Sequence, residues 1–76
     1  MANFIPVDGP VQTVATPLTM TALQKLVGEP IELVELPSGD LMVMNRIAVS
    51  NNKNATSIAG RPMYGQIVLC SPEEIA

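Results

Sequence analysis

The chain has 76 residues, is 47% hydrophobic and only 14% charged, and carries a formal net charge of −3. A chain of this length forms one small domain, and its hydrophobic content argues against intrinsic disorder. No apolar run reaches the roughly 18–20 residues needed to cross a membrane. The first six residues also lack the basic start and apolar run of a secretory signal, so we expect a soluble domain of the cytoplasm.

The N-terminal part of the chain predicts two short strands. Apolar residues alternate weakly with polar ones on both sides of Asp8-Gly9-Pro10, a sequence typical of a turn. We therefore expect two short strands, at Asn3–Val7 and at Val11–Ala15.

A helix is predicted next, between two recognisable end signals. Thr21 and Gln24 have the spacing of a capping box, and Gly28 stands where a left-handed C-terminal cap belongs. A second possible start lies earlier, with Thr16 as the cap and Pro17 in the first turn. The sequence leaves both starts open.

The clearest hairpin follows this helix. Ile31–Leu36 has acidic residues facing water, Pro37–Asp40 supplies the turn, and Leu41–Asn45 forms the returning strand. Met42 and Met44 share one face of that second strand. Flexible thioethers suit both a core and an adaptable contact surface, so core and interface remain two interpretations of this pair.

The last third of the chain predicts an exposed loop, a helical turn and a strand. Residues 50–54 are polar and are typical of an exposed loop, and Ala55–Ala59 predicts one helical turn closed by Gly60. Tyr64–Leu69 ends in a nearly continuous apolar run, which favours a central strand. Ser71-Pro72-Glu73-Glu74 has the pattern of a second helix start.

Together these elements predict a single α+β domain over residues 1–76, a small antiparallel sheet of four to five strands with one main helix packed on it. Only eleven charged residues keep this domain in solution, and its mean hydropathy is +0.32. A small domain has much surface for its volume, so apolar side chains are left outside the core. We therefore expect self-association into a homo-oligomer.

The residue types that are missing argue against catalysis. The chain has no His, and Cys70 is its single Cys. Zinc sites are built mainly from Cys and His, and the Ser–His and Cys–His nucleophile systems need an imidazole. Cys70 follows an apolar stretch with no basic neighbour, which predicts a buried, inert thiol. We therefore expect a protein that is not an enzyme and that uses neither a metal nor a cofactor.

Charge is distributed unevenly along the chain. Residues 1–40 hold five acids and one base, whereas residues 41–72 hold three bases and no acid. Guanidinium groups pair with phosphate, amides hydrogen-bond to base or sugar edges, and a Tyr ring can stack. The candidate ligand-binding residues are Arg46, Asn54, Arg61 and Tyr64, with Asn45 and Lys53 as weaker candidates. The alternative interpretation is a solvated loop with scattered bases. Nucleic acid is not expected as a partner, because the chain has four bases and a pI of about 4.5.

Five short motifs in order resemble a known family. They are Leu23–Gly28, Ile31–Val34, Gly39–Asn45, Asn54–Thr56 and Tyr64–Val68. In this series the chain resembles the domain-of-unknown-function family 3846, small proteins carried mainly by phages and bacteria, over roughly residues 19–70. The family has no established activity, so the resemblance implies only a context, that of a phage accessory protein in an infected bacterium.

Two functional hypotheses follow. In the first, the protein is a non-enzymatic counter-defence or host-takeover factor in the bacterial cytoplasm. It would bind or sequester a small anionic, nucleotide-like signal or a host protein. In the second, it is a structural or regulatory module whose apolar surface docks on a larger phage or host complex. Neither hypothesis involves a membrane.

Overall fold

Five strands form one sheet in the part of the chain that the computed structural model describes, residues 2–76. The elements are β1 (Ala2–Ile5), β2 (Gln12–Val14), α1 (Met20–Val27), β3 (Ile31–Glu35), β4 (Leu41–Asn45), α2 (Lys53–Ala59), β5 (Ile67–Cys70) and a 3-10 turn, η1 (Pro72–Glu74). The strand order is β2-β1-β5-β4-β3, and every neighbouring pair is antiparallel. The α+β fold is confirmed, and β5 is the central strand, as predicted.

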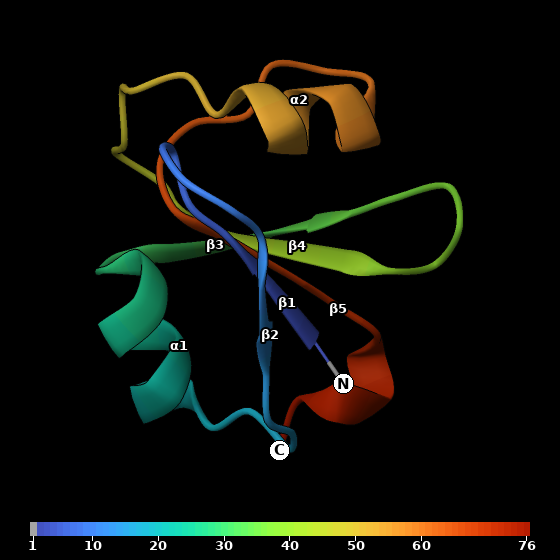
Figure 1. Ribbon diagram of the computed structural model, residues 1–76. Helices are drawn as coiled ribbons and strands as arrows, with labels where there is room; N and C mark the ends of the chain where they lie inside the picture. The colour runs from blue at the N-terminus through green and yellow to red at the C-terminus, as the bar shows by residue number, and fades with distance from the viewer. Residues whose placement is uncertain (1) are drawn as a thin grey trace.

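The sheet is covered on both faces. Helix α1 lies on one face and α2 on the other (Figure 1). Successive side chains of a strand point to opposite faces, so Val43 packs on the α1 side while Met42 and Met44 pack on the α2 side. Burial on both faces explains why β4 is apolar at four of its five positions, without the alternation of a half-exposed strand.

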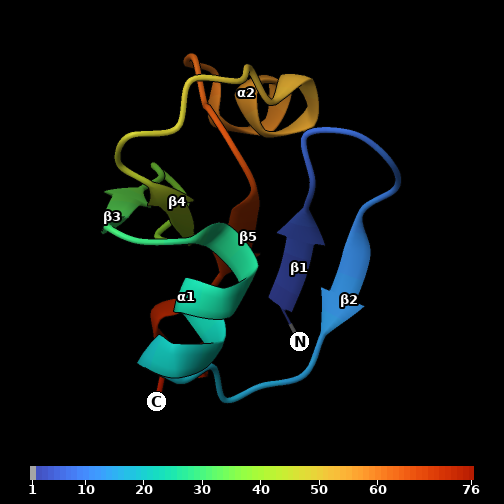
Figure 2. The same cartoon turned by 90° about the vertical axis from the view of Figure 1, so that its left-hand side faces the viewer.

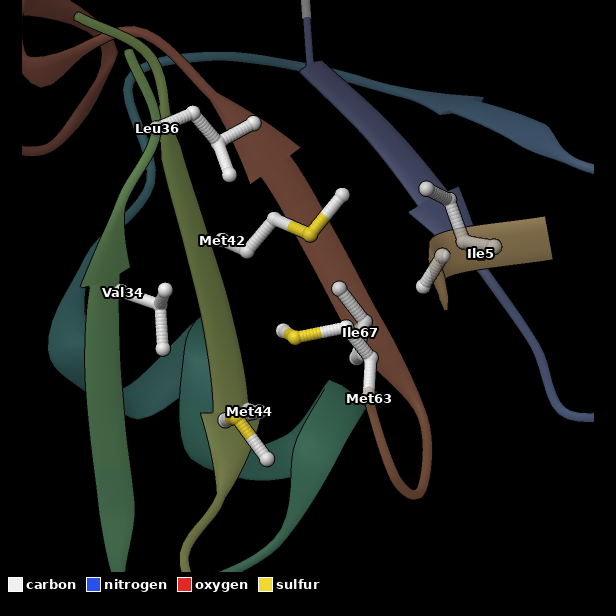
Figure 3. Close-up of a cluster of buried hydrophobic side chains, with 8 residues drawn as sticks. Ile5, Val34, Leu36, Met42, Met44, Met63 and Ile67 are labelled. Carbon is white, nitrogen blue, oxygen red and sulfur yellow. The ribbon is translucent and has the colours of Figure 1, made fainter. Parts of the chain in front are cut away.

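The methionines of the α2 side belong to the core. Met42, Met44 and Met63 are buried, and they lie among Ile5, Val34, Leu36 and Ile67 (Figure 3). Of the two interpretations left open for Met42 and Met44, the structure selects the core. Unbranched thioether side chains fill the irregular space beneath a short helix that itself contributes only alanines, Ala55 and Ala59, to this cluster.

Helix α1 begins at a residue that the sequence patterns did not indicate. Its N-cap is Thr19, whose Oγ1 accepts a 3.1 Å hydrogen bond from the Ala22 N–H. The starts expected at Thr21 and at Thr16 are both wrong, because Leu18 is paired with the segment around Ile75 and the helix begins only after it. The helix ends at Gly28, as predicted, but with a ψ of 174° this cap is not in the expected left-handed helical conformation. Gly28 has a φ of +83°, and a Cβ there would lie 2.8 Å from the Asn45 Nδ2.

Strand boundaries differ from prediction for two backbone reasons. β1 ends at Ile5 because Pro6 has no N–H to continue the ladder. β5 starts at Ile67 and not at Tyr64, because Gly65 has a φ of +78° and interrupts the extended backbone. Within residues 2–76 no helix is long and apolar enough to span a membrane.

Candidate functional site

Residue 52 overturns the expectation of an exposed loop at residues 50–54. Asn52 is completely buried and is the N-cap of α2, which runs to two turns and so exceeds the single turn predicted. Its Oδ1 accepts from the Ala55 N–H at 3.0 Å, and its Nδ2 donates to the carbonyls of Ile5 at 2.9 Å and Gly65 at 2.8 Å. One carboxamide thereby ties α2 to the end of β1 and to the segment before β5. The pattern of polar residues did not indicate this burial, because the two carbonyls that accept from Asn52 belong to segments remote from the start of α2.

The loop between β4 and α2, residues 46–51, is held at its first half by Asn45. The side-chain Oδ1 of Asn45 accepts a 3.0 Å hydrogen bond from the Ile47 N–H, and the backbone carbonyl of Asn45 accepts one of 3.2 Å from the Ala48 N–H. Its Nδ2 donates to the Glu29 carbonyl at 3.4 Å. Both ends of the Asn45 carboxamide are thus used to shape the chain.

The second half of this loop pairs with the segment before β5. The Gly65 N–H donates to the Ser50 carbonyl at 2.7 Å, and Asn51 and Tyr64 form an antiparallel bridge. The approach is close, since a Cβ on Gly65 would lie only 2.5 Å from the Ala48 Cβ. The loop is therefore fixed on both sides by backbone hydrogen bonds and by packing.

Apolar side chains project from this fixed loop into water. Ile47 is 68% exposed and Val49 is 86% exposed, and Tyr64 on the paired segment is partly exposed at 37%. We call Ile47, Val49 and Tyr64 the loop patch. A single exposed aliphatic residue is ordinary on a protein surface. Ile47 and Val49 are both β-branched and lie two residues apart on a hydrogen-bonded loop, and the fold itself does not need their exposure. Sequence reasoning missed Ile47 and Val49, and their spacing between polar residues was the available signal.

The candidate residues from the sequence are spread along α2 and its flanks. Arg46 is exposed at the end of β4, where its N–H donates to the Pro30 carbonyl at 2.8 Å. Lys53 and Asn54 are exposed in the first turn of α2, and Arg61 follows the Gly60 cap at the other end. A seven-residue helix is about 10 Å long. The structure therefore places Arg46 and Tyr64 around the same fixed loop and sets Arg61 beyond the far end of α2.

The rest of the described surface, within residues 2–76, offers no enclosed site. The surface of this described part has no pocket, and it holds no group of three or more His, Cys, Asp or Glu side chains placed to bind a metal ion. Cys70 is buried, as predicted. Burial is the main cause that raises the pKa of the Cys70 thiol, and the negative charges of Glu74 and Asp40 raise it further.

Comparison of the chain with protein-family models, with curated proteins and with solved structures gave no match. The resemblance to the domain-of-unknown-function family 3846 accordingly stays a prediction.

Proposed function

We propose that this protein is a non-enzymatic binding module that docks on a partner protein through the loop patch. The observation that supports this function is the exposure of Ile47 and Val49 on a loop whose backbone is hydrogen-bonded on both sides. A loop that is already ordered loses little conformational entropy on binding. Apolar side chains at the centre of a contact supply most of its binding energy once water is excluded.

The charges around the patch define the chemistry of the partner. Arg46 directly precedes Ile47, and Lys53 begins the helix that follows the loop. The fold also brings one exposed acid, Glu29, to the start of the loop, where its backbone carbonyl accepts from the Asn45 Nδ2. The two bases outnumber it. Complementary charge at the rim of an interface guides encounter and selects the partner. The proposed partner therefore offers an apolar recess with an acidic rim.

The cellular context of this proposal comes from the family resemblance. It implies a phage accessory protein acting in the cytoplasm of an infected bacterium, so the partner is a host protein or a larger phage or host complex. Counter-defence or host takeover is the role that such binding would serve.

The test compares two variants with the same change of side chain. Val49→Asp alters the loop patch, and Val11→Asp alters an exposed valine just before β2. Both tagged variants and the wild type are used to capture proteins from infected bacteria. A stoichiometric protein that is held by the wild type and by Val11→Asp but lost with Val49→Asp supports the proposal. Equal capture by both variants, or no captured protein at all, contradicts it.

A second candidate function is sequestration of a small anionic, nucleotide-like ligand. It is supported by the exposure of Arg46, Lys53 and Arg61 in a segment without acids. Calorimetry with cyclic and linear nucleotides tests it. Arg46→Ala and Arg61→Ala are expected to leave the fold intact and to weaken anion binding. Flat traces with the whole set, or unchanged affinity in both variants, exclude this function.

A further inference from the structure

Strand β3 is an edge of the sheet. The hydrogen bonds at its two ends show which of its residues direct their backbone N–H and C=O groups toward β4. The Arg46 N–H donates to the Pro30 carbonyl, and the Leu36 N–H donates to the Asp40 carbonyl, both at 2.8 Å. In an antiparallel pair, hydrogen-bonded positions alternate with positions whose backbone groups point away from the partner strand. The even-numbered residues of β3 therefore bond to β4. The N–H and C=O groups of Ile31, Leu33 and Glu35 point outward.

This outward row is uninterrupted and uncovered by the described residues. The register of β3 on β4 is continuous from Ile31 to Glu35, without a bulge. The strand contains no Pro or Lys, two residues that commonly protect an edge from pairing, and its charged residues are Glu32 and Glu35. No other segment of residues 2–76 lies outside β3 (Figure 2). The opposite edge is shorter, because β2 has only three residues, whereas β3 has five.

The central residue of this edge carries an exposed apolar side chain. Leu33 is 54% exposed, although it lies in the middle of a strand. We propose that β3 pairs antiparallel with β3 of a second copy of this chain, across a twofold axis at Leu33. The two sheets then form one continuous sheet, and the two Leu33 side chains cover each other.

The outward groups are self-complementary about this axis. Leu33 stands opposite Leu33 of the second copy, and Ile31 stands opposite Glu35 in both directions. Each of these three opposed pairs exchanges two hydrogen bonds, so every outward N–H and C=O between Ile31 and Glu35 finds a partner. An axis moved to either neighbouring residue would satisfy only two such pairs.

The charges of the strand tolerate the same arrangement. Glu35 faces Ile31 of the second copy, and Glu32 faces its Val34, so no two carboxylates stand directly opposite each other. An axis at Glu32 would oppose the two Glu32 side chains, which is unfavourable across strands. A second copy would also cover part of the exposed apolar surface. The chain has only eleven charged residues and a positive mean hydropathy, so such cover reduces the apolar area in contact with water.

A cysteine at the axis tests the register. Opposed residues of a hydrogen-bonded antiparallel pair have Cα atoms about 5.5 Å apart, within the range that a disulfide spans. Leu33→Cys is therefore expected to form a covalent dimer under mild oxidation, visible on a non-reducing gel. Val49→Cys is the matched control, since Val49 is more exposed and the native Cys70 is buried. Equal crosslinking of the two variants at the same protein concentration overturns the proposal.

Sedimentation velocity over a series of protein concentrations tests the contact itself. The wild type is expected to sediment as a dimer, and Leu33→Lys to weaken dimerisation by about tenfold or more, because two apolar side chains leave the contact and two like charges meet. Val49→Lys is expected to leave the dimer unchanged. A wild type that stays monomeric, or a dimer lost with Val49→Lys and kept with Leu33→Lys, overturns the assignment. A urea transition on each variant verifies that it is folded. The partner-capture experiment tests the loop patch through Val49→Asp, whereas the dimer is tested through the Leu33 variants. Either proposal can therefore fail without the other.

Discussion

The side-chain amide of Asn52 donates a 2.8 Å hydrogen bond to the carbonyl of Gly65, inside a region with no access to water. This bond joins the start of α2 to the segment that carries Tyr64, and it thereby holds the two sides of the loop patch in place. The conformation of the candidate site thus depends on a residue that is itself completely buried.

Replacement of Asn52 is expected to destabilise the whole domain. Asn52→Leu keeps the branching at Cγ, adds volume, and leaves the carbonyls of Ile5 and Gly65 and the N–H of Ala55 without their partner. Burial of unsatisfied polar groups predicts a loss of about 3 kcal/mol in the free energy of unfolding, measured by urea denaturation. Asn54→Leu, at an exposed position of the same helix, is the control and is expected to change stability by less than about 0.5 kcal/mol. Similar losses of unfolding free energy in both variants would contradict a stabilising role of the hydrogen bonds of Asn52.

Gly65 and Ala48 form a second coupled pair. Gly65→Ala is expected to lower the free energy of unfolding by about 3 kcal/mol, from the strain of a positive φ and from overlap with the Ala48 Cβ. Gly60→Ala has nearly the same φ but open space around the new methyl group, so a loss of about 1 kcal/mol is expected there.

The double variant separates the two causes at Gly65. Adding Ala48→Gly to Gly65→Ala removes the overlap and leaves the backbone strain. Chemical denaturation should therefore show partial recovery, to a loss comparable with that of Gly60→Ala once the effect of Ala48→Gly alone is subtracted. A double variant that loses the plain sum of the two single effects would contradict contact between these positions.

The start of α1 can be tested by two threonines of the same segment. Thr19→Ala removes the side chain that accepts from the Ala22 N–H, and a loss of about 1 kcal/mol is expected. Thr21→Ala lies inside the helix, where alanine is the better helix former, so stability should stay level or rise slightly. Thermal unfolding of the two variants is sufficient to distinguish them. A larger loss of stability in Thr21→Ala than in Thr19→Ala would instead indicate that Thr21 is the cap.

The Cys70 thiol predicts a stability change at alkaline pH. Its pKa is raised in the folded protein above the ordinary value of about 9, chiefly by burial. The neutral thiol therefore contributes fully to stability below that ordinary value, and the contribution is lost as the pH rises from there through the folded pKa. The free energy of unfolding of the wild type should fall relative to that of Cys70→Ala above about pH 9. Parallel pH profiles for the two proteins would contradict a buried thiol.

Several features of this protein were determined by short stretches of the sequence. The hairpin of β3 and β4, the ends of both helices at Gly28 and Gly60, and the central position of β5 were all predicted, because turn residues, helix caps and apolar runs act over a few neighbouring residues. The candidate site was predicted in part. Arg46 and Tyr64 were named from their chemistry, and the structure places them around one fixed loop.

Only the tertiary structure decided the rest, since burial is a property of distant segments brought together. Asn52 looks like any other residue of a polar loop until β1 and the segment before β5 supply carbonyls to its amide. Ile47 and Val49 resemble core residues in the sequence, yet the structure leaves both exposed. The outward row of β3 exists because pairing with β4 selects which alternate residues bond inward. Local residue preferences therefore set the elements of this protein, and contacts between remote elements set which surfaces remain open for binding.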